Sequence, residues 1–126
     1  MELIEGDVVE MSPIGAAHIR YVNRLNHLLA PAVQGRAIVS IQSSIALPPR
    51  SEPEPDLALL AWREDFYTEL ARPDDVLLII EVADSIVAED RRRKLPLYAA
   101  GGIPEAWLVD LPAGLIEMHS QPGPHG

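Results

Sequence analysis

The chain has 126 residues, of which 48% are hydrophobic, and its ten basic and nineteen acidic side chains give a formal charge of −9. A chain of this length buries one sizeable core, so we expect a single domain over residues 1–126. It has no cysteine and no run of the roughly 18 apolar residues that a membrane helix needs, which excludes a disulfide framework, a thiolate metal site and a helical membrane protein. No apolar leader opens the chain, which favours a cytoplasmic protein. The acidic excess opposes general attraction to nucleic-acid phosphates.

The first half of the chain alternates apolar runs with turn-forming residues. Gly6-Asp7 suits a tight reversal between two short strands. Apolar residues then recur at helical spacing and stop before Gly35. The proline-rich stretch "PPRSEPEP" cannot join a sheet ladder. We therefore expect hairpin arms at 2–5 and 8–11, a helix at 16–34, and strands at 37–47 and 55–62.

The second half begins with a charged connection, 63–72, that has a helical tendency. Its most apolar run, "VLLIIEVA", is rich in β-branched residues and predicts a strand buried on both faces. Pro96 lies inside the next helical stretch and should kink or restart it. We expect a strand at 76–83, a helix at 86–100, and a strand hairpin at 105–111 and 114–120. The order of elements predicts an α/β or α+β fold, a mixed β-sheet flanked by helices with an N-terminal β-hairpin.

Glu81 is a carboxylate inside that apolar run, and a lone buried carboxylate is costly unless it has a partner. If the strands at 55–62 and 76–83 pair antiparallel, Asp56 lies beside Glu81 at one edge of the sheet. Two adjacent carboxylates repel unless a hard divalent cation lies between them, which favours Mg²⁺ or Mn²⁺. The alternatives are that Asp56 only begins a strand and that Glu81 pairs with backbone donors or an arginine.

Lys94 follows on the next helix, with Tyr98 one turn later on the same face. A lysine near a metal-bound water can orient the nucleophile and stabilise charge on a phosphate, which favours phosphodiester hydrolysis. Lys94 could instead form only a surface pair with Asp90. Tyr98 could be a core residue with a satisfied hydroxyl, and His18 a buried, hydrogen-bonded histidine.

Two short motifs carry a resemblance to a known family. Pro55-Asp56 followed by Glu81-Val82-Ala83 resembles the PD-(D/E)XK signature of the restriction-endonuclease-like superfamily, with Ala83 where the usual lysine stands. Members with a migrated lysine carry it on the following helix, as Lys94 is here. The wider pattern, "ELIEGDVVEMSP", His18, "PEPDLAL", "IIEVADS" and "KLPLYAAGGIPEAWLVD", strongly resembles the bacterial Uma-two family over residues 2 to about 119. The resemblance implies a domain that is shortened at both ends relative to that family.

The resemblance implies a role for each matching residue. Asp56 and Glu81 would be metal ligands, the Val82 carbonyl a third ligand, and Lys94 the catalytic lysine, with Mg²⁺ or Mn²⁺ as cofactor. Glu5 would be an outer acidic residue, acting directly or through water. His18 and Tyr98 would support the ligands without binding the ion themselves.

The only dense basic run is Arg91-Arg92-Arg93-Lys94, beside the expected site. It could grip a nucleic-acid backbone or could equally be a solvated helix face. The first hypothesis is thus a metal-dependent endonuclease acting on nucleic acid, with DNA favoured over RNA although the sequence does not separate the two. A homodimer is expected. The alternative is a catalytically inactive interaction or assembly module that keeps the fold. The acidic charge and short ends favour the module, whereas the complete set of Asp56, Glu81 and Lys94 favours the enzyme.

Overall fold

A computed structural model describes residues 2–9, 15–84 and 88–120 of the chain. The elements, in chain order, are β1 (Glu2–Ile4), β2 (Asp7–Val9), α1 (Ala16–Val33), β3 (Ala37–Ile41), β4 (Leu57–Ala61), the 3-10 turn η1 (Pro73–Asp75), β5 (Val76–Ala83), α2 (Ala88–Ala100), β6 (Glu105–Asp110) and β7 (Leu115–Ser120). None of the helices in these ranges has the length and apolar content needed to cross a bilayer.

Five strands form one mixed sheet in the order β3-β4-β5-β6-β7, and β1 and β2 form a separate hairpin. Strands β5 and β6 run parallel, with α2 as the crossover between them, and the other pairs in the sheet are antiparallel. A parallel pair needs such a long connection, whereas antiparallel neighbours can be joined by turns. The predicted mixed sheet with helices and an N-terminal hairpin is confirmed.

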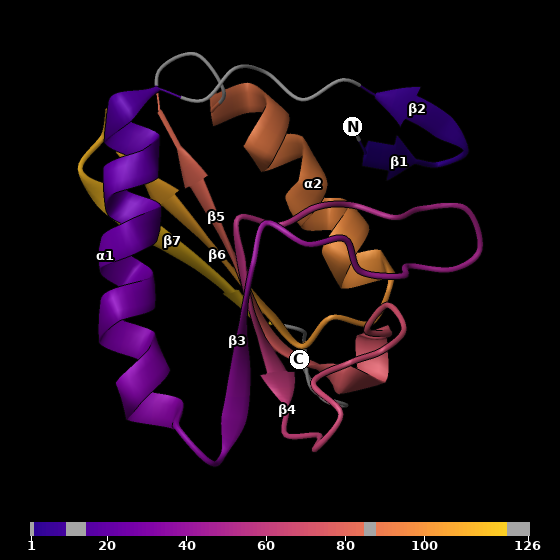
Figure 1. Cartoon of the computed structure of the whole chain (residues 1–126). Coiled ribbons are helices and arrows are strands. Elements are labelled where there is room, and N and C mark those ends of the chain that lie inside the picture. The colour runs from indigo at the N-terminus through magenta and orange to yellow at the C-terminus, as the bar shows by residue number, and fades with distance from the viewer. Residues whose placement is uncertain (1, 10–14, 85–87, 121–126) are drawn as a thin grey trace.

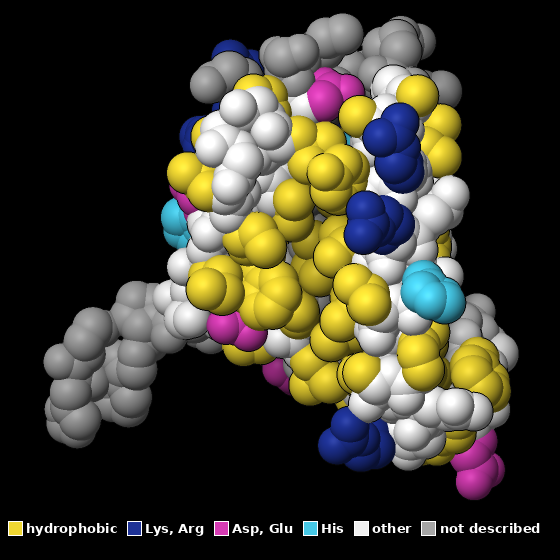
Figure 2. Space-filling model, turned by 90° about the vertical axis from the view of Figure 1, so that its left-hand side faces the viewer, with side chains coloured by type: hydrophobic (Ala, Val, Ile, Leu, Met, Phe, Trp, Pro, Cys, Tyr) yellow, Lys and Arg dark blue, Asp and Glu magenta, His cyan; other side chains and the backbone are white. Residues whose placement is uncertain are grey.

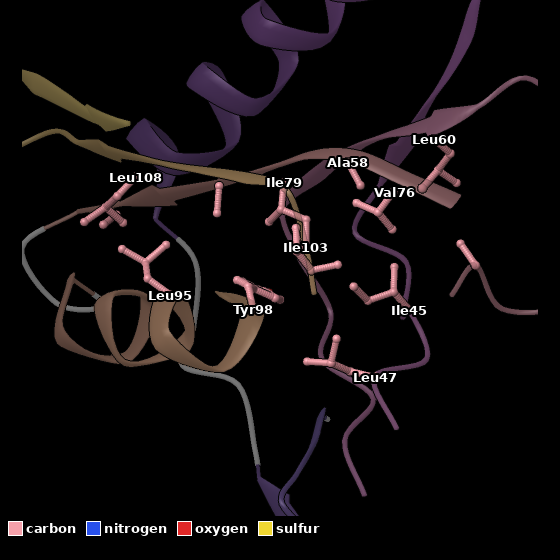
Figure 3. Packing of buried hydrophobic residues seen from close by; sticks show 13 residues of the cluster. Ile45, Leu47, Ala58, Leu60, Val76, Ile79, Leu95, Tyr98, Ile103 and Leu108 are labelled. Carbon is pink, nitrogen blue, oxygen red and sulfur yellow. The ribbon is translucent and has the colours of Figure 1, made fainter. Parts of the chain in front are cut away.

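The two helices lie on opposite faces of the sheet (Figure 1). On the α2 face, Leu95 and Tyr98 of the helix point toward Ile79 and Leu108 of the sheet (Figure 3). On the α1 face, Val22 packs against Leu57, Leu78, Ile80, Val82 and Val109. Because alternate residues of β5 belong to the two clusters, the strand is buried on both faces, as its apolar sequence predicts.

The β1–β2 hairpin lies against the long connection between β3 and β4 (Figure 1). The Leu3 amide donates to the Glu52 carbonyl at 3.3 Å, and the Glu52 amide donates to the Leu3 carbonyl at 2.7 Å. These two bonds hold β1 at the end of the sheet where β4 begins. The first strand of the chain therefore lies beside the segment that leads into Asp56 and β4.

Two predicted segments differ from the structure. The strand expected over 37–47 ends at Ile41, and the next residue, Gln42, has a φ of +48°, which lies outside the β region. The helical tendency of 63–72 is not realised: Phe66 and Tyr67 have φ values of +54° and +68°, and the Asp65 carboxylate accepts the Tyr67 amide at 3.0 Å. Short polar side chains that bond the backbone locally compete with a helix in this way.

Pro96 lies inside α2, which runs as one helix from Ala88 to Ala100 without a restart. The start expected at 86 falls in 85–87, outside the described residues.

Candidate functional site

The register of β4 and β5 brings Asp56 and Glu81 together. Leu57 pairs with Ile80 in an antiparallel ladder, so Asp56, one residue before, lies beside Glu81, one residue after. Their exposed fractions are 1% and 0%. The Val82 amide donates to Asp56 Oδ2 at 2.7 Å, which fixes the Asp56 side chain against β5. The predicted juxtaposition of the two strand ends is confirmed.

Helix α2 supplies three side chains to the same place, because residues at spacings of three and four share one helical face. Lys94 Nζ lies 3.0 Å from Glu81 Oε1, and the Tyr98 hydroxyl donates to the same oxygen at 2.7 Å. Lys94 is 5% exposed and Tyr98 is fully buried. The lysine therefore points into the protein, toward the carboxylate that the sequence pairs with it.

Arg91 is the third of these side chains, and it lies between the two carboxylates. Its Nε is 3.2 Å from Asp56 Oδ2 and 3.2 Å from Glu81 Oε2. Its Nη2 donates to Asp56 Oδ1 at 3.4 Å. The arginine is only 2% exposed, so its charge is compensated inside the protein by Asp56 and Glu81.

The acidic residue that the hairpin contributes is Glu2. Lys94 Nζ donates to Glu2 Oε1 at 2.5 Å, and the Glu54 amide donates to the same oxygen at 2.8 Å. Glu5, the outer acidic residue expected from the sequence, is exposed at the turn after β1 with a φ of +49°. Its amide donates to Ser51 Oγ at 2.8 Å, and its side chain does not join the buried cluster.

His18 reaches the site from the first turn of α1 and is fully buried. Its Nε2 lies 3.0 Å from Asp56 Oδ1, but neither ring nitrogen has an aligned hydrogen bond within the described residues. Asp56 is therefore contacted from three elements, α1, β5 and α2.

Burial raises the pKa of Glu81 from 4.5 to about 7, and the charge of Asp56 adds to the increase although Lys94, Arg91 and Tyr98 oppose it. Burial alone would also raise the pKa of Asp56. The His18 contact, the Arg91 charge and the Val82 amide outweigh it and lower the pKa. The two carboxylates therefore titrate apart, with Asp56 ionised at neutral pH and Glu81 the one that can carry a proton.

The cations of the cluster keep their charge. Burial opposes the charged forms of Lys94 and Arg91, but the neighbouring carboxylates more than compensate and raise the pKa of both side chains. Burial and the charge of Glu81 raise the pKa of Tyr98 well above 10.0. The tyrosine therefore stays a hydroxyl that donates to Glu81.

The site offers few side chains that could bind a divalent ion, although their oxygens are of the right chemical kind. In residues 2–9, 15–84 and 88–120, no three or more His, Cys, Asp or Glu side chains are grouped to hold a metal. Asp56 and Glu81 remain as a pair of hard oxygen ligands, which suits Mg²⁺ or Mn²⁺. Glu81 Oε2 is buried and accepts no hydrogen bond within that part of the chain. A buried oxygen on a carboxylate with a raised pKa is one that an added cation would stabilise.

The basic run of α2 does not form one surface. Arg91 is buried, so it is not part of a basic face for nucleic acid. Arg92 pairs with Asp110 at 3.0 Å and with Glu117 at 2.7 Å. Arg93 is exposed. Of the three arginines in the run, Arg92 and Arg93 are thus the two with side chains at the surface, where a nucleic-acid backbone could contact them.

The sequence analysis did not predict that Glu2 and Arg91 belong to the buried cluster. Arg91 precedes Lys94 by three residues, and this spacing puts both side chains on one helix face. The interpretation of residues 91–94 as a surface patch did not use this signal. No local signal identifies Glu2, since its contacts depend on where the hairpin docks.

The same fold occurs in a solved protein. The chain resembles the crystal structure of "a putative nuclease belonging to DUF820" from Anabaena variabilis ATCC 29413, with a TM-score of 0.78 and 16% sequence identity, over 97% of this chain and 72% of that one. The mixed sheet, its flanking helices and the hairpin thus define an α+β protein with the fold of that structure. The chain belongs to the Uma2 family, whose model, described as "Putative restriction endonuclease", matches residues 1–126. A comparison with curated proteins gave no match.

Proposed function

We propose that this protein is a metal-dependent nuclease of the PD-(D/E)XK type, which hydrolyses phosphodiester bonds. Membership of a family described as "Putative restriction endonuclease" supports the class of activity. The observation that carries the proposal is the meeting of Asp56, Glu81 and Lys94 in one buried cluster, with Lys94 Nζ 3.0 Å from Glu81. Mg²⁺ or Mn²⁺ is the cofactor that such a set of oxygen ligands would take.

In this proposal Asp56, Glu81 and the Val82 carbonyl would hold the ion. When bound, the ion would lower the pKa of a water and offset negative charge on the phosphate. Lys94 keeps its positive charge beside Glu81, where it can stabilise charge that develops on a phosphoryl oxygen. Tyr98 orients the Glu81 carboxylate by donating its hydroxyl hydrogen to it, and His18 lies in contact with Asp56.

The substrate that we propose is nucleic acid, DNA in preference to RNA, which agrees with the family's description as "Putative restriction endonuclease". Arg92 and Arg93 are the side chains of the basic run that could contact its backbone. Because the chain carries a formal charge of −9, we expect binding without metal to be weak.

The first test is urea unfolding with and without Mn²⁺, for the wild type and Glu81→Gln. An ion that binds only the folded state stabilises it by about 2.7 kcal/mol at 100 times its dissociation constant. We expect this gain in the wild type and its loss in Glu81→Gln. Glu64→Gln, at an exposed carboxylate, should behave as the wild type. No metal-dependent gain in the wild type would contradict the metal site.

The second half of the test is cleavage of labelled DNA and RNA with Mg²⁺ or Mn²⁺. Lys94→Met should lower the cleavage rate by at least about tenfold while Mn²⁺ still stabilises the fold, since the lysine is proposed to act on the phosphate and not on the ion. Cleavage that survives in Lys94→Met would exclude the catalytic role of this lysine.

A second candidate, a non-enzymatic interaction or assembly module, is favoured by the surface beside α1. Hydrophobic side chains gather over the centre of this face (Figure 2). By register, Ile116 lies opposite Val109 and Met118 opposite Trp107, so they extend the apolar side of the sheet with exposed fractions of 51% and 66%. Such a surface suits association, and we propose a homodimer under either candidate.

A further inference from the structure

Arg91 occupies the space between the two carboxylates that would hold the ion. Its Nε is 3.2 Å from an oxygen of each, so these two oxygens lie no farther apart than the sum of the two distances. A divalent ion held by Asp56 and Glu81 would compete with the guanidinium for these carboxylate oxygens. The guanidinium and the ion cannot both contact them, because they would share one space and carry the same sign of charge.

We propose that Arg91 is a resident cation of the site, which compensates Asp56 and Glu81 while the protein is metal-free and which a divalent ion must displace. This inference rests on the proposed function, since it assumes that the ion binds at this pair. It gives Arg91 a positioning role in place of the nucleic-acid contact that the basic run suggests.

The contacts of the two buried cations show which one an ion would displace. Within the described residues, the Arg91 guanidinium contacts Asp56 and Glu81, which are the two proposed ligands themselves. Lys94 also contacts Glu2 at 2.5 Å and the Glu54 carbonyl at 3.4 Å. If an ion binds Asp56 and Glu81, Lys94 keeps Glu2 and Glu54 as partners. Arg91 then loses its contacts with Asp56 and Glu81.

The charge of the cluster also indicates that an ion would displace Arg91. Three carboxylates, Glu2, Asp56 and Glu81, face the two cations Arg91 and Lys94 in a cluster that is at least 93% buried at every member. A divalent ion added beside both cations would give the cluster a net positive charge. Its binding with departure of Arg91 leaves the carboxylates balanced, so exchange is favoured over addition.

The test measures Mn²⁺ affinity by titration calorimetry in the wild type, Arg91→Met and Arg24→Met. Methionine keeps much of the length of the arginine side chain without its charge. If Arg91 competes with the ion, Arg91→Met should bind Mn²⁺ at least about tenfold more tightly than the wild type. Arg24 is exposed on α1, so Arg24→Met should match the wild type and control for the lost charge.

Equal affinity in the wild type and Arg91→Met would overturn the inference and leave the metal site standing. Binding in neither protein would overturn the metal site itself, and the inference with it. The two failures are therefore distinguishable.

A second measurement covers the case in which Arg91→Met does not fold without metal. The Nε–H resonance of Arg91 in the wild type, followed by nitrogen-edited NMR, reports on its contact with Asp56. Displacement predicts that Mg²⁺ shifts this resonance and removes its protection from solvent exchange. An unchanged, protected resonance at saturating Mg²⁺ would overturn the proposal.

Discussion

Glu81 is the residue at which the sequence and the structure meet. It is a carboxylate in the most apolar strand of the chain and is fully buried, with Lys94 and Tyr98 on one oxygen. Its second oxygen has Arg91 within 3.2 Å but no aligned donor in the described ranges. The expectation that a buried carboxylate needs a cation or donor is confirmed, although the neighbours found are side chains of α2.

The raised pKa of Glu81 predicts a pH dependence of stability. The protonated form favours the folded state, so this contribution is complete below pH 4.5 and is lost as the pH rises through about 7. Glu81→Gln stays neutral throughout. In EDTA, the stability of Glu81→Gln relative to wild type should therefore increase by about 3 kcal/mol between pH 4.5 and pH 8.

Urea unfolding at several pH values measures this difference. Glu64→Gln, at an exposed position, should show no comparable trend. A wild type that gains stability against Glu81→Gln as the pH rises would mean that Glu81 is ionised and well compensated by Lys94 and Arg91.

At the scale of elements, the position of α2 depends on the contact made at its C-terminal end as well as on the face that it packs against the sheet. Gly101 follows the last residue of α2 and lies against Leu47 of the long β3–β4 connection. A methyl group on Gly101 would come within 2.8 Å of Leu47 Cγ and nearer still to Cδ1. A glycine at this point lets α2 approach the connection that also holds the β1–β2 hairpin.

Gly101→Ala should therefore destabilise the fold by about 1 to 3 kcal/mol, as overpacking of a tight contact does. The double variant with Leu47→Ala should lose less than the sum of the two single changes, because the smaller side chain makes room for the methyl group. Thermal and urea unfolding of the four proteins complete the cycle. Additive losses would show that the Leu47 contact is not the cause.

The elements themselves differ in how far their sequences predict them. The strand at 76–83 is found within its predicted limits and the helix at 16–34 within one residue, since each has a long apolar pattern of a single period. The helical tendency of 63–72 fails because Asp65 binds the backbone of Tyr67. Such local competition depends on side-chain geometry that periodicity does not report.

For the whole molecule, the sheet is covered unevenly. Helix α1 packs against β3 and β5, whereas Ile116 and Met118 of β7 stay exposed beside it on the same face of the sheet. This apolar surface beside α1 (Figure 2) is the one that we propose for the homodimer.

Met118→Lys should therefore shift the proposed dimer to a monomer in light scattering coupled to size exclusion. Lysine places a charge on the apolar face without adding to the acidic excess of the chain. Leu77→Lys is the matched control, because Leu77 is exposed but alternates with Leu78 and so faces the other side of β5. A wild type that is monomeric at every concentration would remove the basis for the dimer.

The sequence by itself determined the fold class and the order of the elements, because these follow from apolar periodicity. It also placed Asp56 beside Glu81 on the condition that their strands pair antiparallel, which the structure confirms. It also indicated that Lys94, Tyr98 and His18 belong to the site through its resemblance to a family. Only the tertiary structure decided that Glu2, and not Glu5, contacts Lys94 and that Arg91 lies between the carboxylates. Those contacts join β1, β4, β5 and α2, and such long-range positions are set by packing and by burial of charge, which no local pattern encodes.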